Sequence, residues 1–341
     1  MVSMHPQKAV EILTAELPKR SGAVLEKRFG LGKTGKRQTL EAIGKGYGIT
    51  RERVRQIERD SIIRIKKSAA YKDVMPVFFV FEEYITQKGG IVAEDQLVRQ
   101  FDTDGKSQNH IVFLLTLAPA IDHKPENDEL ASRWITNTEK MTAVENALNA
   151  VHADIEQSTS LLSRDELVSK VQNHMEAHNV SADSDELDRY IGISKCIGEN
   201  CFGQWGHASS SLVRPRGVRD MAYLVFQREG KPLHFLSVAN LIRDLVAERS
   251  VHAQTVHNEL IKDSRFVLVG RGMYGLREWG YEPGTVRDII MRMLRKDSLT
   301  KEEIVDKVLD KRQVKANTIL INLQNKKFFK KLSDGRYTAV A

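Results

Sequence analysis

The stretch that decides the fold of the N-terminal domain runs Thr39-Leu40-Glu41-Ala42-Ile43-Gly44-Lys45-Gly46-Tyr47-Gly48-Ile49-Thr50-Arg51-Glu52-Arg53-Val54-Arg55-Gln56-Ile57-Glu58. Thr39 and Thr50 each precede a helical pattern, and threonine is a good N-cap residue. Between the two patterns, Gly46 and Gly48 predict a tight turn that contains a residue with positive φ. Two helices joined in this way form a helix-turn-helix, and we expect Ile49 in the core of its turn.

The second helix of this unit separates apolar side chains from polar ones. Helical spacing predicts a buried stripe of Val54, Ile57, Ile62 and Ile65. The opposite, exposed side carries Arg51, Glu52, Arg55, Gln56 and Arg59. Arginine and glutamine pair bidentately with guanine and adenine edges in the major groove, and glutamate can accept from cytosine N4. The pattern therefore predicts a helix that reads DNA bases.

The residues before this unit predict two more helices, over 7–16 and 18–29. Pro18 suits the first position of a helix and Gly30 suits the end of one. A basic loop, Gly32 to Gln38, then leads into the helix-turn-helix.

This N-terminal segment resembles region 4 of the primary sigma factor family. The resemblance rests on Leu17-Pro18-Lys19-Arg20, Val24-Leu25-Glu26-Lys27-Arg28-Phe29-Gly30-Leu31, Thr39-Leu40-Glu41-Ala42-Ile43-Gly44 and the run from Ile49 to Glu58. In that family the domain reads the −35 promoter element and docks on the flap of the RNA polymerase β subunit. The resemblance implies double-stranded DNA and the RNA polymerase core as partners.

The resemblance also implies roles for single residues. The implied base readers are Arg51, Glu52, Arg55 and Gln56, and the first two helices would carry the flap contact. Side chains that contact phosphates position the protein without reading sequence. The residues expected to do so are Thr39, Thr50, Arg53, Arg59, Lys36, Arg37, Lys66 and Lys67.

The C-terminal part of the chain contains an internal repeat. Residues 251–274 align without gaps on 314–337, with identities that include Ala253/Ala316, Phe266/Phe329, Gly272/Gly335 and Tyr274/Tyr337. Strands over 265–269 and 273–278, and over 328–332 and 336–340, are joined by glycine-containing connections typical of hairpins. Helices followed by a hairpin predict a winged helix. Residues 217–279 resemble the HARE-type winged helix, a family that includes a module of the RNA polymerase delta subunit.

Two weaker copies of this pattern precede the repeat, within 74–136 and 141–206. We therefore expect a mainly α chain, in which an N-terminal helix-turn-helix bundle is followed by tandem winged-helix (α+β) modules. The expected domains are 1–72, 73–138, 139–212, 213–282 and 283–341.

Charge is distributed unevenly along the chain. Residues 1–72 have 17 Lys and Arg against 7 Asp and Glu, and residues 283–341 have 14 against 7. Between them, residues 73–282 have 21 against 31. Basic ends favour contact with a polyanion at one or both termini. The Lys326-Lys327 and Lys330-Lys331 pairs fit a DNA-touching wing and a solvated lysine face equally well.

Several classes of protein are excluded by the same inspection. Two cysteines cannot form a disulfide framework, and this favours a cytoplasmic protein. No run approaches the roughly 20 apolar residues that span a membrane, and the first six residues lack the apolar core of a secretory signal. We therefore expect no membrane contact.

Cys196 and Cys201, with His207 or with His174 and His178, are candidate zinc ligands. Their spacing is one residue beyond the usual short knuckle, which favours a buried structural cysteine instead. No serine, histidine or paired-carboxylate arrangement belongs to a recognisable catalytic motif. We expect neither a metal nor a cofactor, and we expect that the protein is not an enzyme.

The leading hypothesis is a transcription-initiation factor or regulator that reads −35-type promoter DNA and docks on RNA polymerase. One alternative is a polymerase-binding adaptor that does not read sequence. Another is a reader of modified DNA linked to restriction or defence.

Overall fold

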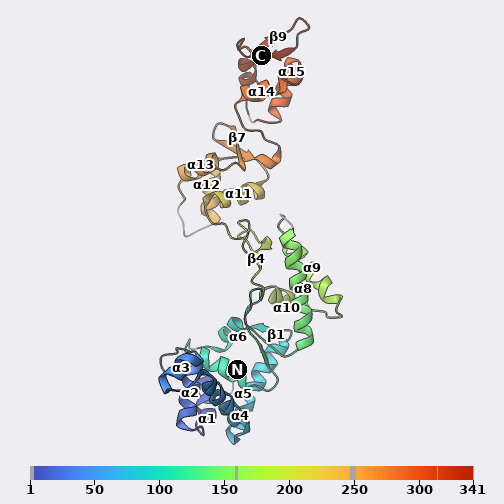
Figure 1. The fold of residues 1–341 in the computed structure, drawn as a ribbon. Helices are drawn as coiled ribbons and strands as arrows, with labels where there is room; N and C mark the ends of the chain where they lie inside the picture. Colours follow the sequence, from blue (N-terminus) through green and yellow to red (C-terminus); the bar gives the residue numbers. More distant parts are fainter. Residues whose placement is uncertain (1–3, 104, 158–159, 246–250, 313, 341) are drawn as a thin grey trace. The chain divides into compact units, whose positions relative to one another are not determined.

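The computed structural model describes residues 4–103, 105–157, 160–245, 251–312 and 314–340. Residues 1–3, where part of the secretory-signal expectation falls, lie outside the described residues. The chain is mainly helical with small antiparallel sheets (Figure 1). It divides into two compact units, Met1–Ser209 and Ser210–Ala341.

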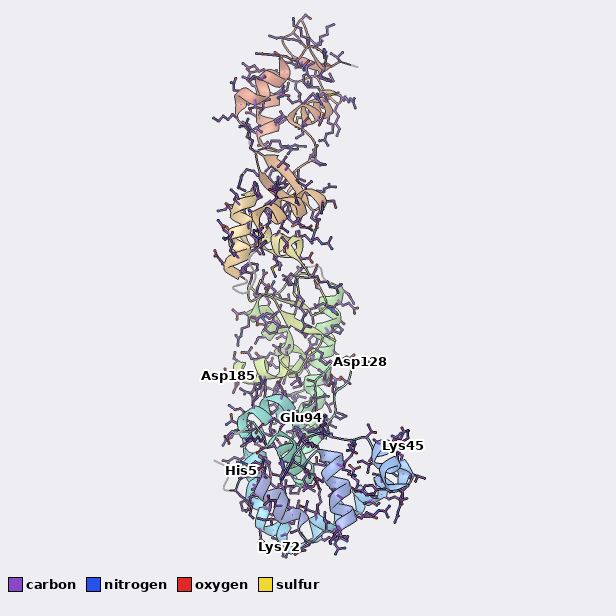
Figure 2. All side chains as sticks on the ribbon, turned by 90° about the vertical axis from the view of Figure 1, so that its left-hand side faces the viewer. His5, Lys45, Lys72, Glu94, Asp128 and Asp185 are labelled. Carbon is purple, nitrogen blue, oxygen red and sulfur yellow. The ribbon has the colours of Figure 1, made fainter. Side chains whose placement is uncertain are left out.

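The first unit begins with four helices, of which the third and fourth form the predicted helix-turn-helix. These are α1 (Pro6–Thr14), α2 (Lys19–Phe29), α3 (Leu40–Tyr47) and α4 (Arg51–Lys67). Both predicted caps are confirmed, because Thr39 Oγ1 accepts from the N–H of Ala42 at 3.1 Å and Thr50 Oγ1 from that of Arg53 at 3.2 Å. In Figure 2, Lys45 on α3 marks the outer edge of these helices.

The turn between α3 and α4 is shorter than expected. Gly48 has a φ of +64° and ends α3, as predicted, but Gly46 lies inside α3 and not in the turn. The backbones of α3 and the turn also approach closely, since a Cβ on Gly44 would lie 2.6 Å from the carbonyl oxygen of Ile49. Ile49 packs against the small core of this unit, which contains Val24, Ile43 and Val54.

A larger core joins these helices to the next segment of the chain. Ser68 ends α4, and its hydroxyl accepts from the N–H of Tyr71 to cap α5 (Ala69–Gln87). Helix α1 packs against α5 and α7 (Gln108–Leu117). Its Val10 and Leu13 share one core with Ile65 of α4 and Phe113 of α7. The boundary expected after residue 72 therefore does not separate two cores.

The segment after α4 has the order helix, strand, helix, helix, hairpin. Besides α5 and α7 it contains β1 (Ile91–Ala93), α6 (Glu94–Phe101), β2 (Asp122–Lys124) and β3 (Arg133–Ile135). The strands form an antiparallel sheet in the order β1-β3-β2. Val92 and Trp134 face the first core, whereas Ile91 and Ile135 belong to a second core. Trp134 Nε1 donates to Glu94 at 3.0 Å, in the middle of this unit (Figure 2).

The second core belongs to a segment with the same order of elements. It contains α8 (Thr138–Gln157), α9 (Arg164–Glu176), α10 (Ser184–Ile191), β4 (Ile197–Glu199) and β5 (Trp205–His207). Leu162 pairs with Trp205 as a single β-bridge before α9. Cys196 is partly buried and Cys201 is exposed, so the expectation of a buried cysteine is wrong for Cys201, which lies in the connection between the two strands.

The second unit contains two further copies of this order, and in the last copy a single β-bridge between Leu299 and Tyr337 takes the place of the strand after the first helix. Its first copy contains α11 (Val218–Glu229), β6 (Leu233–His234), α12 (Phe235–Leu245), α13 (Ala253–Lys262), β7 (Phe266–Gly270) and β8 (Met273–Leu276). Its second contains α14 (Val286–Leu294), α15 (Lys301–Leu309), α16 (Ala316–Leu323), β9 (Phe329–Lys331) and β10 (Tyr337–Ala339). Helices α13 and α16 begin at aligned alanines, and β7 and β9 begin at aligned phenylalanines.

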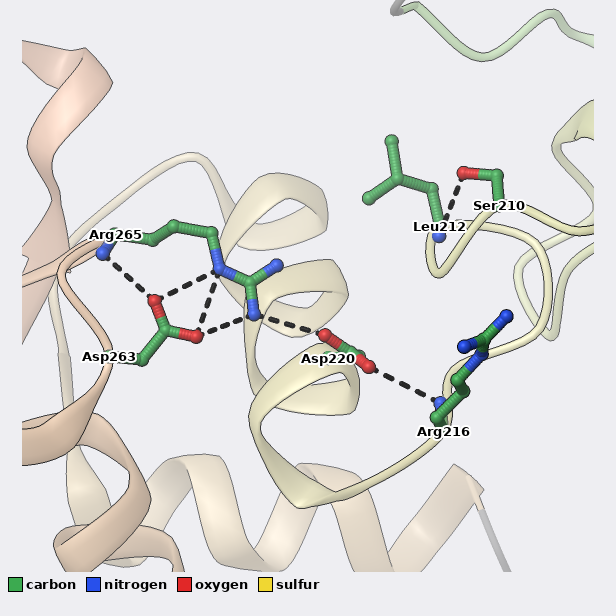
Figure 3. A network of polar contacts seen from close by, with 6 residues as sticks. All are labelled: Ser210, Leu212, Arg216, Asp220, Asp263 and Arg265. Carbon is green, nitrogen blue, oxygen red and sulfur yellow. Dashed lines mark hydrogen bonds and ion pairs between the residues drawn. The ribbon is translucent and has the colours of Figure 1, made fainter.

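One partly buried ion network ties α11 to the hairpin of the first copy (Figure 3). Arg265 donates from Nη2 to Asp220 at 3.0 Å and to Asp263 at 2.6 Å. Asp220 is 8% exposed and also accepts from the N–H of Arg216. The hydrogen bonds from Arg265 hold the pKa of the Asp263 carboxyl below its ordinary value.

This network predicts a pH-dependent stability. Because the pKa of Asp263 is lower in the folded chain, the pair stabilises the fold above the unfolded pKa of about 3.9 and loses that effect as pH falls through the folded pKa. Arg265→Met should cost about 2 kcal/mol at neutral pH. The difference in transition midpoint from the native chain, measured by calorimetry, should shrink below about pH 4. A difference that stays constant into acid would show that the ion pair is not its source.

Candidate nucleic-acid interface

The four expected base readers lie together at the start of α4. Arg51, Glu52, Arg55 and Gln56 are all exposed. An α-helix rises 1.5 Å per residue, so they occupy only about 8 Å of its axis. This places two arginines, a carboxylate and an amide on the first two turns of one exposed helix.

Two of these side chains pair with each other in the free protein. Arg55 donates from Nε and Nη2 to the two carboxylate oxygens of Glu52, at 2.9 and 2.6 Å. This pairing lowers the pKa of Glu52 and raises that of Arg55. Both side chains remain more than half exposed. The fork of Arg55 is therefore held in one orientation by Glu52.

Arg53 contacts a base reader as well. It was expected at a phosphate, but its Nη1 donates to Gln56 Oε1 at 3.0 Å. The amide N–H groups of Gln56 remain available to donate. Bidentate pairing with adenine uses the oxygen too, so the contact from Arg53 has to open for that mode of recognition.

The expected phosphate contacts surround this group. The hydroxyl oxygens of Thr39 and Thr50 accept the capping hydrogen bonds, which leaves each hydroxyl proton free to donate. Both residues stand at helix N-termini, where the partial positive charge favours anions. The remaining candidates, Lys36, Arg37, Arg59, Lys66 and Lys67, are exposed. The last two follow Arg51 by about 20 Å along α4, which suits phosphates away from the reading end.

The basic loop before α3 is fixed by a residue from outside the sigma-like segment. Asn109 on α7 donates from Nδ2 to the carbonyl oxygens of Gly30 and Gly35, at 3.0 and 2.8 Å. Arg37 donates from Nε to Asn109 Oδ1 at 2.8 Å. More than 70 positions separate Asn109 from its partners, so no local sequence pattern indicated this contact.

Helix α2 is also joined to the helix-turn-helix by charge. Lys27 Nζ lies 4.5 Å from the centroid of the Tyr47 ring, and Arg20 approaches the same ring. Arg28 forms an ion pair with Glu58 on α4 at 3.5 Å. These contacts orient α4 relative to α2 and therefore orient the exposed reading face.

The part of the chain that the structure describes shows neither a metal-binding cluster nor a membrane-spanning helix. No three His, Cys, Asp or Glu side chains are grouped there as ligands for a metal ion. None of the helices described combines the length and apolar character needed to cross a bilayer.

A capped α3, a turn through Gly48 and an α4 with an exposed basic and polar face define a helix-turn-helix DNA-binding domain. Residues 15–67 match the family described as Sigma-70, region 4. The chain therefore carries a sigma region 4 domain, the DNA-binding domain of RNA polymerase sigma factors, and this supports a role in transcription.

Relatives of this domain are sigma factors. The RNA polymerase principal sigma factor HrdD of Streptomyces viridifaciens is 39% identical over 57 residues, which are 17% of either chain. HrdD of Streptomyces griseus is 37% identical over 57 residues, again 17% of either chain. The RNA polymerase sigma factor RpoS of Coxiella burnetii is 45% identical over 60 residues, 18% of this chain and 17% of its own. The similarity thus spans under a fifth of each relative.

The contacts of Asn109 predict a local effect on the basic loop. Asn109→Leu removes the donor to Gly30 and Gly35 and the acceptor of Arg37, so hydrogen exchange over residues 31–38 should rise about tenfold, equivalent to about 1.4 kcal/mol. Gln108→Leu, one residue away and exposed, is the matched control and should leave the loop unchanged. Equal exchange in the two variants would contradict the role given to Asn109.

Proposed function

We propose that this chain is a sigma-like transcription-initiation factor or regulator whose α4 reads −35-type promoter DNA. The observation that carries the proposal is the joint exposure of Arg51, Glu52, Arg55 and Gln56 on the first two turns of α4, inside the matched region 4 domain. Arginine and glutamine fit guanine and adenine edges, and glutamate fits the amino group of cytosine.

The contacts among these side chains support a reader that exchanges partners on binding. Glu52 holds Arg55 and Arg53 holds Gln56 in the free protein. Each contact lies at the surface, where an ion pair costs little to open. A correct base edge replaces the contact, whereas a wrong one leaves a charged group without a partner. Discrimination then comes from the unpaired groups as much as from the new bonds.

We also propose that the first helices contact the RNA polymerase core, through its β flap. The apolar face of α1 is buried against α5 and α7, so this face is not available to a partner. A cleft of ≈ 860 Å³ remains between α1, α2, the basic loop and the start of α7. Gly22 on α2 lines this cleft, and a Cβ added there would meet no atom within 4 Å. The cleft is therefore open where a polymerase segment would enter.

The rest of the chain is proposed to be four winged-helix modules, divided at 73–138, 139–212, 213–282 and 283–341. The repeated order of helices followed by a hairpin supports this division. The HARE-like assignment of residues 213–282 is part of the same proposal. The first module would act as a scaffold for the sigma-like domain, because α7 packs against α1 and contacts the basic loop.

We further propose that the chain is not an enzyme and acts by binding alone. Sigma factors, in which the matched domain recurs, support this view. The rival hypothesis is a polymerase-binding adaptor that ignores DNA sequence. It would have the same fold without a base-reading α4, so only a binding experiment distinguishes it from a promoter reader.

Selection from random duplex DNA at two salt concentrations tests the reading function. We expect a short −35-like motif to be enriched by the native chain and lost with Arg55→Ala or Gln56→Ala, since each bidentate contact carries about 1–3 kcal/mol of discrimination. Lys67→Ala should weaken binding to all sequences evenly.

Two outcomes would redirect the proposal. Binding that collapses with salt and leaves no motif is driven by counterion release alone and would favour the adaptor. A motif that survives both α4 variants would assign sequence reading to another part of the chain.

Occupation of the cleft gives a separate prediction for polymerase binding. Gly22→Trp places a large side chain in the cleft and should weaken binding to the purified polymerase core at least about tenfold, or about 1.4 kcal/mol. Gly46→Trp is the matched control, because Gly46 is also helical, also has open space at its Cβ and does not line the cleft. Equal binding by the two variants, read from fluorescence anisotropy, would place the polymerase contact elsewhere.

A further inference from the structure

Helix α16 presents one unoccupied polar face. Ile319 and Leu323 are buried, whereas Asn317, Ile321 and Gln324 are exposed at spacings that place them on one side of the helix. Within the described residues, the amides of Asn317 and Gln324 make no hydrogen bond. Ile321 is 60% exposed between them. Amides suit adenine edges, and an exposed aliphatic side chain suits the methyl group of thymine.

The hairpin after α16 is surrounded by positive charge. From residue 315 to the C-terminus the sequence has six Lys and Arg and a single acidic residue, Asp334. Four lysines flank or form β9: Lys326, Lys327, Lys330 and Lys331. All four are exposed, and in the part of the chain described here none forms an ion pair. The lysines of α15 do not form such a positive surface, because Glu302, Glu303, Asp306 and Asp310 stand beside them in the sequence.

The preceding copy of the fold shows that these lysines are not needed for folding. Its aligned positions hold Asp263, Ser264, Val267 and Leu268. The helix and hairpin form there all the same, over α13, β7 and β8. Asp263 pairs with Arg265 in that copy, and Gln254 on α13 donates to Asn258 at 3.2 Å. The scaffold therefore forms without this lysine cluster, which leaves the four side chains free to contact a ligand.

Helices α7 and α10, which occupy the position of α16 in the two modules of the first unit, are not suited to contact DNA. Residues 111–115 of α7 are buried. Helix α10 carries Asp185, Glu186 and Asp188, whose charge repels phosphate. Glu186 is paired with Lys140, and Tyr190 donates to the carbonyl oxygen of Gly89. Compared with these helices, α16 combines a free face with flanking positive charge.

We propose that α16 and the β9–β10 hairpin form a second binding site for duplex DNA. In this site α16 lies in the major groove with Asn317, Ile321 and Gln324 toward base edges. The lysines after α16 and on β9 contact the phosphates beside the groove. The proposal goes beyond the sigma-like function and does not depend on base reading by α4. It gives the chain two separate DNA contacts, one at each basic end.

The test measures binding of the full chain to a short random duplex as a function of salt. The test variant replaces Lys326, Lys327, Lys330 and Lys331 by glutamine. The matched control removes four exposed cations that belong to the same module but lie outside α16 and the hairpin: Arg295, Lys296, Lys301 and Lys307. Both variants are measured in the native background and together with Arg55→Ala and Gln56→Ala, which remove the expected α4 readers. Thermal unfolding checks that each variant is folded.

We expect the test variant to reduce the slope of log affinity against log salt by about 3.6, because each of the four lost phosphate contacts removes about 0.9. The control should leave the slope near its native value. The reduction should persist in the α4 background, so failure of α4 reading and failure of this proposal give different results. Asn317→Ala with Gln324→Ala should then change the enriched flanking sequence without changing the slope.

Three results would overturn the proposal. The first is an equal change of slope in the test variant and the control. The second is equal or tighter binding of a matched RNA duplex, which would assign the surface to RNA. The third is an unchanged slope accompanied by weaker binding of the polymerase core, which would make the lysines a protein-docking surface.

Discussion

The first unit depends on one apolar core that helices from both sides of Ser68 build together. Phe78 and Phe81 of α5 pack with Phe113 of α7, and the ring of Phe29 on α2 lies 4.8 Å from that of Phe113. Removing apolar area of this size from water outweighs any single polar contact at the surface. Because α1 and the end of α4 enter the same core, the helix-turn-helix is held by the segment that follows it.

This shared core decides which surfaces remain for partners. It uses the apolar face of α1 and nearly all of α7, and it leaves the opposite side of α4 exposed. The sheet of β1 and β3 is covered on both faces. One face packs against the first core, and the other packs against the core that α8–α10 build. In the second unit the last copy has a core of its own, the cluster around Ile304 and Ile319. This core buries one side of α16 and of the hairpin and leaves their outward-facing side chains exposed.

Surface electrostatics add a second level to this arrangement. Glu52 and Arg53 hold Arg55 and Gln56 in place on the exposed face of α4. Such exposed contacts contribute little to stability, but they fix the orientation of the side chains. By contrast, Arg265 bridges two carboxylates in a partly buried setting, where its role is to hold α11 to the hairpin.

The sequence by itself determined the local structure and the kind of chemistry on α4. The caps at Thr39 and Thr50, the positive φ of Gly48 and the hairpins at 266–276 and 329–339 depend on neighbouring residues, and all were predicted. Only the tertiary structure decided that Gly46 is helical, that Asn109 fixes the basic loop and that one core crosses residue 72. Burial and long-range hydrogen bonds depend on which distant residues meet in space, and no local pattern in the sequence carries that information.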